Sequence, residues 1–117
     1  MNGSHIQPGV ATGDALQAIF DLAKQKQFAL PAVNVINTST VNTVMETARE
    51  LKAAAIIQFS NGGAQFFAGK GLDNTDQRCC IAGAVSGATH IHQLAELYGA
   101  TVIIHTDHAA KKLLPWI

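Results

Sequence analysis

Two histidines and an aspartate end an apolar run in the stretch VIIHTDH, which runs from Val102 to His108. Imidazole nitrogen is a good ligand for Zn²⁺, and a carboxylate can either bind a metal or transfer protons. Because side chains alternate along a strand, His105 and Asp107 should point one way and His108 the other, until the strand ends. Spacing alone therefore leaves open which histidine would be a ligand.

A catalytic zinc usually has about three protein ligands, and this stretch offers only one or two of them. Further ligands would have to come from elsewhere. A second interpretation stays open at this point, namely a strand-end cluster satisfied by hydrogen bonds, with one histidine partly buried. Clustered titratable groups mark functional sites often but not always.

A glycine-rich segment, SNGGAQFFAGKG, begins at Ser60 and follows another apolar run. Such a loop after a strand can present backbone N–H groups to a phosphate, and here these would be the groups of Gly62 and Gly63 beside Ser60. It is not a Walker loop, because Ala64 stands where that motif needs glycine and Gly71 stands where it needs serine or threonine. The alternative is a flexible turn in which Ser60 is only a cap.

Other residues of suitable chemistry give weaker indications. His90 and His92 are two apart on a predicted helix and share no face, so we expect packing or interface roles for them. A Schiff base is conceivable at Lys70 or Lys111, but nothing nearby indicates the desolvation that this chemistry needs. His5, among the first few residues, is assigned no role.

Three short apolar runs predict the strands that would position these groups. They show little alternation, as expected for strands covered on both faces, and they span residues 28–34, 55–60 and 101–105. Pro31 is awkward in a central strand, so the first run is the least secure. Polar residues follow each run: Asn34, then Ser60–Asn61, then the HTDH cluster.

Helical spacing between the runs predicts three helices and the start of a fourth. They cover 14–26 with a cap at Thr12 or Asp14, then a segment from Ser39 or Thr40 to Leu51, then 81–98 ending at Gly99, and a last one from Lys111. Strands separated by helices of this length pair in parallel through right-handed crossovers. In such folds ligands lie beyond the carboxyl ends of the strands, so the polar groups should share one rim.

The composition indicates a small globular domain. The chain has 117 residues, 48% of them hydrophobic and 14% charged, and eight basic residues balance eight acidic ones. A zero net charge argues against a nucleic-acid surface, and the apolar runs are too short to span a membrane. The only two cysteines, Cys79 and Cys80, make no disulfide framework, which favours a reducing, cytoplasmic setting.

The fold class that these elements predict is α/β, as the N-terminal part of a (β/α)₈ TIM barrel with about three strands and their helices. A closed barrel needs about 250 residues. We therefore expect residues 1–117 to be a single incomplete barrel domain, the front part of a larger barrel.

Several segments resemble class II fructose-bisphosphate aldolases. VIIHTDHAAKKLLPWI resembles their zinc-site signature, QFSNGGAQFFAGKG the loop after their second strand, FALPAVNVINTSTVNTVMETA their first strand and following helix, and PGVATGDALQAIF their N-terminal helix. The resemblance runs from about Pro8 to Ile117. Because proteins of the family continue well beyond this point, the resemblance implies that residues 1–117 are the N-terminal third of the family's chain. The HxDH signature together with SNGGA is specific and is most similar to the class IIA branch.

The resemblance implies roles for individual residues. His108 matches a zinc ligand, and Asp107 matches the acid/base that exchanges a proton with the C4 hydroxyl of the sugar. Ser60 matches a residue that helps to hold a substrate phosphate, and Asn34 matches a substrate-contacting asparagine. His105 has no catalytic role in the family and would support or pack against the site.

The implied reaction is the reversible cleavage of fructose 1,6-bisphosphate into dihydroxyacetone phosphate and glyceraldehyde 3-phosphate. Zn²⁺ would act as a Lewis acid that stabilises the enediolate, while Asp107 removes the C4 hydroxyl proton. The resemblance further implies a homodimeric lyase of glycolysis and gluconeogenesis in the cytoplasm, with a monovalent cation as a possible second ion of the complete enzyme. No lysine imine, nucleic acid or membrane is involved.

Alternatives stay open at this stage. The remaining zinc histidines, an assisting glutamate and a second phosphate pocket lie in parts of the family that this chain does not match. The chain alone is therefore expected to be inactive and to bind zinc poorly. A tagatose 1,6-bisphosphate aldolase, a non-catalytic truncated barrel fragment and a metal-independent phosphate-binding module are the other readings.

Overall fold

The computed structural model describes residues 6–117, so His5 lies outside the described residues. Its elements follow in the order β1 (Gly9–Val10), α1 (Gly13–Lys26), β2 (Ala32–Asn34), α2 (Thr38–Leu51), β3 (Ala55–Phe59), α3 (Asn61–Ala68), α4 (Arg78–Tyr98) and β4 (Thr101–Thr106). There are also two 3₁₀ turns: η1 (Thr75–Gln77) precedes α4, and η2 (Lys111–Trp116) follows β4. The alternation of strands and helices predicted from the apolar runs is confirmed.

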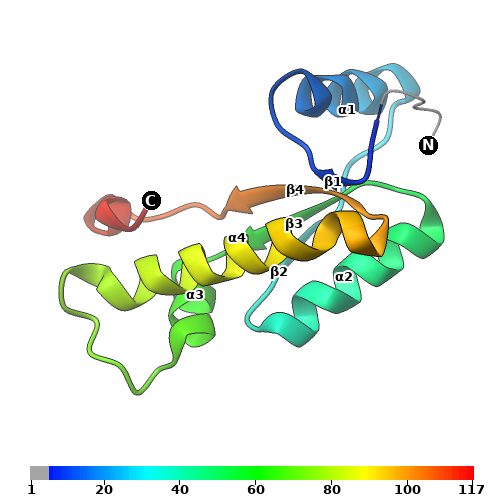
Figure 1. Ribbon diagram of the computed structural model, residues 1–117. Coiled ribbons are helices and arrows are strands. Elements are labelled where there is room, and N and C mark those ends of the chain that lie inside the picture. Colours follow the sequence, from blue (N-terminus) through cyan, green and yellow to red (C-terminus); the bar gives the residue numbers. More distant parts are fainter. Residues whose placement is uncertain (1–5) are drawn as a thin grey trace.

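The strands form one parallel sheet in the order β1-β4-β3-β2 (Figure 1). β3 lies between β4 and β2, and the short β1 pairs only with the first residues of β4. The register sets Asn34 of β2 beside Gln58 of β3, and Gln58 beside His105 of β4. All carboxyl ends therefore point to one edge of the sheet, as the helical connections between the runs predicted.

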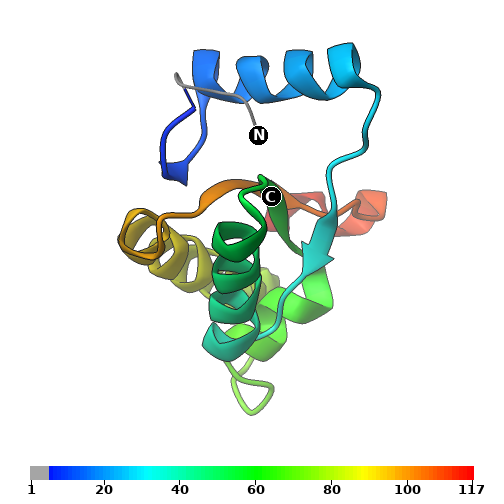
Figure 2. The same cartoon turned by 90° about the vertical axis from the view of Figure 1, so that its right-hand side faces the viewer.

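Helices α2, α3 and α4 lie on one face of the sheet, and α1 crosses the other face (Figure 2). The alternation of side chains along β3 and β4 divides the core in the same way. Ile57, Phe59 and Val102 are fully buried in the cluster that the three helices cover. Ile103 points to the opposite face and packs in a second cluster with Ile19 of α1. Each strand therefore has one face for each layer of helices.

The crossing of α3 and α4 depends on glycine. A Cβ atom at Gly83 would lie 1.7 Å from the backbone oxygen of Ala64, and one at Gly87 would lie 2.4 Å from the ring of Phe59. Both glycines are buried. Because no side chain separates the two backbones, α3 is held against α4, and its first turn is fixed beside the end of β3.

The start of α2 differs from the prediction. Asn37 is the N-cap, and its Oδ1 accepts a hydrogen bond of 2.8 Å from the N–H of Thr40. The Thr40 hydroxyl in turn accepts from the N–H of Asn37 at 3.2 Å, which completes a capping box. The predicted cap at Ser39 or Thr40 is therefore wrong, since both residues lie inside the helix. The predicted end of α4 at Gly99 is confirmed by its left-handed φ of 69°.

Two other segments also differ from the prediction. The glycine-rich segment after Ser60, expected to be a loop, begins with α3. The segment from Lys111, expected to open an α-helix, forms the 3₁₀ turn η2, which contains Pro115. Proline has no backbone N–H and disfavours a continuing α-helix. Within residues 6–117, no helix has both the length and the apolar character needed to cross a membrane.

The strands show two differences at their margins. The first predicted run yields only the short β2, although the carbonyl of Pro31 accepts a bond of 2.9 Å from the N–H of Ile56 just before it. The unpredicted β1 is fixed by the N–H of Gly9, which donates to the carbonyl of Ala100 at 2.8 Å. A strand of this length has no hydrophobic pattern that a sequence could reveal.

Candidate active site

A row of polar side chains crosses three strands near their carboxyl ends. Asn34, Gln58 and His105 occupy registered positions on β2, β3 and β4, so their side chains share one face of the sheet. This is the face opposite α2, α3 and α4. The apolar pair Ile56 and Ile103, two positions nearer the strand starts, belongs to the cluster beneath α1. The face therefore changes from apolar to polar along the strands.

The members of this row are joined by hydrogen bonds. His105 Nδ1 lies 3.0 Å from Gln58 Oε1, and Gln58 Nε2 donates to Asn34 Oδ1 at 2.8 Å. Asn34 Nδ2 then donates to Asp107 Oδ2 at 3.2 Å. His105 and Asp107 thus contribute to one network from the same face of β4, as the alternation of the strand predicted. We call these four residues the amide network.

Asp107 is held at both carboxylate oxygens. Besides the bond from Asn34, its Oδ1 accepts from the backbone N–H of His108 at 2.9 Å. The side-chain hydrogen bond from Asn34 is the main cause that lowers the pKa of Asp107 below its ordinary value of 3.8, followed by the backbone bond from His108. Hydrogen bonds to the charged form favour ionisation. Asp107 is therefore a carboxylate at neutral pH and can accept a proton.

His108 lies outside the sheet, immediately after Asp107. Its side chain is 96% exposed, compared with 29% for Asp107, and its Nδ1 lies 3.3 Å from Asp107 Oδ1. An exposed imidazole at the rim has the donor chemistry of a zinc ligand. However, no group of three or more His, Cys, Asp or Glu residues in the range 6–117 could hold a metal ion. The described residues thus fit one position of a zinc site and leave the others to be supplied.

Ser60 is the N-cap of α3, in agreement with the capping alternative. Its Oγ accepts a hydrogen bond of 3.0 Å from the N–H of Gly63. The amide of Gly63 is therefore already used, and the N–H groups at the start of the helix are those of Asn61 and Gly62. A Cβ at Gly63 would lie 3.0 Å from the carbonyl oxygen of Val35, which places this first turn beside the residue after Asn34.

The start of α3 is connected to the segments around it through side chains. Asn61 Nδ2 donates to Gln77 Oε1 at 2.7 Å, and Gln77 Nε2 donates to the carbonyl of Lys112 at 3.4 Å. These bonds join α3, η1 and η2 on the same edge of the sheet as Asp107. Ser60 itself makes no hydrogen bond to the amide network among those found in residues 6–117. The structure thus brings Asn34, Asp107 and His108 together. Ser60 follows at the same edge, because the N–H of Asp107 donates to the carbonyl of Phe59 at 2.8 Å.

Comparison with known proteins assigns the chain to a family. The family model "Fructose-bisphosphate aldolase class-II" matches residues 14–114. The chain belongs to this family. The fructose-bisphosphate aldolase class 2 of Escherichia coli K12 is 58% identical over 113 residues, which are 96% of this chain and 32% of that protein. The fructose-bisphosphate aldolase of Campylobacter jejuni serotype O:2 is 54% identical over 112 residues, or 96% of this chain and 30% of its own length.

The class II aldolase fold is supported by a solved structure as well. The crystal structure of fructose-bisphosphate aldolase from Campylobacter jejuni superposes with a TM-score of 0.87 at 53% identity, covering 95% of this chain and 31% of that one. The predicted fold class, the N-terminal part of a TIM barrel, is thereby confirmed. The chain spans about a third of the length of the curated class II aldolases that it matches.

One residue of the candidate site, Gln58, was not identified from the sequence. It precedes Phe59 and Ser60 in the quoted segment QFSNGG, yet no role was predicted for it. One signal was available: Gln58 is the only polar residue of the predicted run 55–60 before its terminal Ser60, and it stands two positions after Ile56. A polar side chain on an otherwise apolar strand needs hydrogen-bond partners, which the neighbouring strands here provide.

The two histidines of α4 take no part in the site. His90 Nε2 lies 2.8 Å from Asn42 Oδ1 of α2, so His90 contributes to packing between these helices, as predicted. His92 is exposed on α4. In this class II aldolase chain, the histidines with access to the rim among residues 6–117 are therefore His105 and His108.

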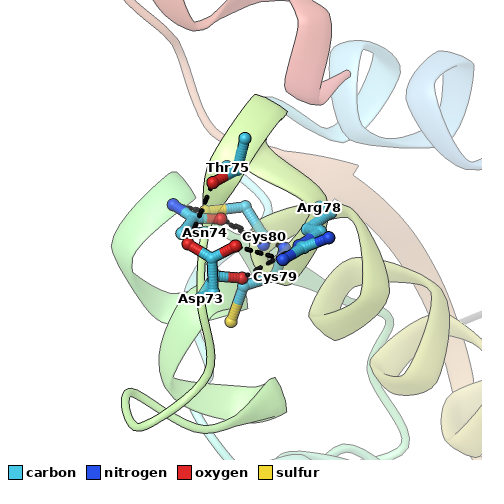
Figure 3. Close-up of polar contacts among 6 residues, drawn as sticks. All are labelled: Asp73, Asn74, Thr75, Arg78, Cys79 and Cys80. Carbon is cyan, nitrogen blue, oxygen red and sulfur yellow. Dashed lines mark hydrogen bonds and ion pairs between the residues drawn. The ribbon is translucent and has the colours of Figure 1, made fainter.

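The cysteines lie in a capping arrangement at the start of α4 (Figure 3). Asn74 Oδ1 accepts from the N–H groups of Cys79 and Cys80 at 3.1 and 3.2 Å, and the two thiols are buried. An ion pair between Arg78 and Asp73 joins the same turn. Asn74 thus satisfies two amides that the helix itself leaves unpaired. This cluster stabilises the turn between α3 and α4.

Proposed function

We propose that this chain is the N-terminal third of one (β/α)₈ domain in a zinc-dependent aldolase. The proposed reaction is the reversible cleavage of fructose 1,6-bisphosphate into dihydroxyacetone phosphate and glyceraldehyde 3-phosphate. The observation that carries the proposal is the ionised Asp107, held by Asn34 beside the exposed imidazole of His108, in a class II aldolase chain. The names of the curated relatives favour fructose bisphosphate over its tagatose isomer.

Asp107 is suited to act as the general base. Breaking the C3–C4 bond requires removal of the C4 hydroxyl proton, and an ionised carboxylate at the rim can accept it. The bonds at its two oxygens leave a lone pair on each of them, since a carboxylate accepts about four hydrogen bonds. In the reverse direction the same group, now protonated, returns the proton. No lysine imine is needed for this step.

His108 is the proposed metal ligand of this part of the chain. Its exposed ring follows Asp107 directly, so a Zn²⁺ held there would lie close to the base. When bound, the ion supplies Lewis-acid polarisation of the substrate carbonyl. Because one imidazole does not bind zinc firmly, the isolated chain should bind it poorly and be inactive.

Asn34 and Ser60 are the proposed substrate contacts. One of the two N–H donors of the Asn34 amide is bonded to Asp107, which leaves the second for a substrate oxygen. The Ser60 hydroxyl accepts from Gly63 and keeps its own hydrogen to donate to a phosphate oxygen. The N–H groups of Asn61 and Gly62 at the start of α3 support the same anion. Capping and phosphate binding are thus compatible at Ser60.

Assembly and location follow as further proposals. A homodimer would bury apolar side chains of α4 that are exposed here, such as Val85 at 60% and Leu97 at 81%. The unpaired, buried thiols of Cys79 and Cys80 support a reducing, cytoplasmic setting. Roles in glycolysis and gluconeogenesis, and a monovalent cation in the complete enzyme, rest on the family resemblance alone.

The decisive experiment uses two chains, the 117-residue chain and a longer chain of the length of its relatives. Zinc content and cleavage of fructose 1,6-bisphosphate are measured for both. We expect activity that EDTA removes and Zn²⁺ restores in the longer chain, and neither activity nor firm zinc binding in the shorter one. Full turnover by the 117-residue chain would overturn the truncation proposal.

Variants of the longer chain then separate the roles. Asp107→Asn should lower kcat by roughly 10²- to 10⁴-fold with zinc retained, which is the range for general acid–base catalysis. His108→Ala should lose zinc, whereas His92→Ala, which removes an exposed imidazole on α4, should keep it. A zinc content of His108→Ala equal to that of His92→Ala would remove His108 from the metal site.

A further inference from the structure

The amide network has a direction that its chemistry dictates. An ionised carboxylate only accepts hydrogen bonds, so Asn34 must turn its NH₂ group towards Asp107. The carbonyl oxygen of Asn34 then faces Gln58 and must accept from the NH₂ group of Gln58. The carbonyl oxygen of Gln58 is left facing His105 Nδ1, which therefore must carry the hydrogen. One charge at the end of the row sets the orientation of every group in it.

The opposite orientation is unfavourable at each step. If the Asn34 amide were flipped, its oxygen would face the Asp107 carboxylate and its NH₂ group would face that of Gln58. Two acceptors would then face each other across the 3.2 Å between Asn34 and Asp107, and two donors across the 2.8 Å between Asn34 and Gln58. Amide orientations are assigned from hydrogen-bond networks, and here only one assignment satisfies all three contacts.

We propose that Gln58 and His105 are positioning residues that lock the Asn34 amide with an N–H group towards Asp107, and that His105 is held as the Nδ1–H tautomer. We call this fixed orientation of the Asn34 amide the lock. It is inferred from the fold alone, whereas its effect on catalysis rests on the proposed function. Without Gln58, the carbonyl oxygen of Asn34 would lose its donor in this row, and the Asn34 side chain would be free to rotate away from Asp107. The base would then lose the donor at Oδ2 that fixes the plane of its carboxylate.

The placement of Gln58 supports this assignment. Gln58 lies on the second of three adjacent strands, with a registered partner on each side, so its amide can bridge Asn34 and His105 at once. Its side chain is partly buried, whereas Asn34 and His105 are exposed. A partly buried amide that lacked partners would destabilise the sheet, and both of its ends are satisfied here. An aliphatic residue would suit the strand but would break the row.

Nitrogen-15 NMR of the imidazole rings tests the lock in the 117-residue chain. Spectra are recorded at about pH 8.5, where histidine rings are ordinarily neutral. We expect His105 to be mainly the Nδ1–H tautomer, with exposed His92 as an internal reference for an unconstrained ring. A mainly Nε2–H ring at position 105 of the unaltered chain overturns the proposal.

Two substitutions of one residue give opposite readouts in the same experiment. Gln58→Met keeps the length of the side chain but can neither accept nor donate, so His105 should lose its bias towards Nδ1–H. Gln58→Glu still accepts from His105 and should keep that bias, but it cannot donate to Asn34. If the His105 tautomer in Gln58→Met is the same as in the unaltered chain and in Gln58→Glu, and the amide spectra show an intact fold in each, the proposal is contradicted.

Kinetics in the longer chain test the consequence for Asp107. Both Gln58 variants should lower kcat by roughly 10- to 100-fold with zinc content unchanged, the range for residues that orient a functional group. His105→Asn, which keeps a donor near the place of Nδ1, should retain more activity than His105→Leu. Equal activity of these two variants would reject a donor role for His105.

The two experiments fail independently. If the longer chain had no aldolase activity, the proposed function would fail while the NMR result still decided the lock. If His105 proved to be the Nε2–H tautomer in an active enzyme, the lock would fail and the proposed function would stand.

Discussion

Replacing Gly83 by alanine should separate α3 from α4. The new Cβ would lie 1.7 Å from the backbone oxygen of Ala64, 2.6 Å from its carbonyl carbon and 3.2 Å from the amide nitrogen of Ala68. These atoms belong to the backbone of α3, so no side-chain rotation relieves the overlap. The whole helix must move, and Ser60, which caps it, moves with it.

The expected loss of stability follows from two opposing effects. Overpacking a close contact usually costs about 1–3 kcal/mol, and a clash with backbone belongs at the upper end of that range. Alanine in place of glycine inside a helix returns about 1 kcal/mol. The net destabilisation of Gly83→Ala should therefore be about 2 kcal/mol, which corresponds to a fall in Tm of roughly 8–16 °C for a domain of about 100 residues.

Gly62→Ala is the matched control. Gly62 also lies in a helix, α3, but a Cβ there would meet nothing within 4 Å. Only the helix propensity then changes, so this variant should be neutral or more stable by up to about 1 kcal/mol. Urea unfolding followed by circular dichroism measures both variants. A Gly83→Ala chain as stable as Gly62→Ala would show that the two helices are not packed as described.

Three further predictions concern single contacts. Gly87→Ala should destabilise less than Gly83→Ala, because its Cβ meets a side chain, the ring of Phe59, rather than backbone; the same unfolding assay compares them. Asn37→Ala removes both the cap and its capping box and should lower the free energy of unfolding by about 1 kcal/mol. Asn34→Ala should raise the pKa of Asp107 towards 3.8, read from a carbon-13 NMR titration, because it removes the main bond to the charged form. The stability that this lowered pKa contributes is present above pH 3.8 and is lost as the pH falls through the folded pKa. Asn34→Ala should therefore reduce this contribution. An unchanged titration midpoint of Asp107 in Asn34→Ala would mean that Asn34 does not bond to the carboxylate.

The strands and long helices were predictable because their signals are local. Apolar runs and three-to-four spacing identify β3, β4, α1 and α4 without knowledge of the fold. The helix after Ser60 was missed because adjacent glycines normally indicate a loop. Tertiary contact overrides this preference here, since Gly63 lies against the carbonyl of Val35 and a larger residue would crowd it. Such an approach between segments nearly thirty positions apart leaves no mark on a local pattern.

The site was predictable to a similar extent. The residue types and their position after a strand indicated the HTDH cluster, and the period of the strand placed His105 on the same face as Asp107. The choice of His108 as the metal ligand came from the family resemblance. What joins them was not predictable, because it depends on the register between strands. Gln58 joins the network only because the register places Asn34 and His105 on either side of it. The sequence around Gln58 does not determine which residues will lie opposite it.

One register builds both the core and the site. Along β3, the residues that face the three covering helices alternate with Ile56 and Gln58, which face the other way. A slip of one residue would turn Gln58 into the hydrocarbon around Phe59 and expose the apolar side chains instead. Burial of the core therefore selects the same alignment that aims the amide network at Asp107. The stability of the hydrophobic layer is thus the physical cause of the geometry at the rim, and it would persist even in variants whose polar row has been broken.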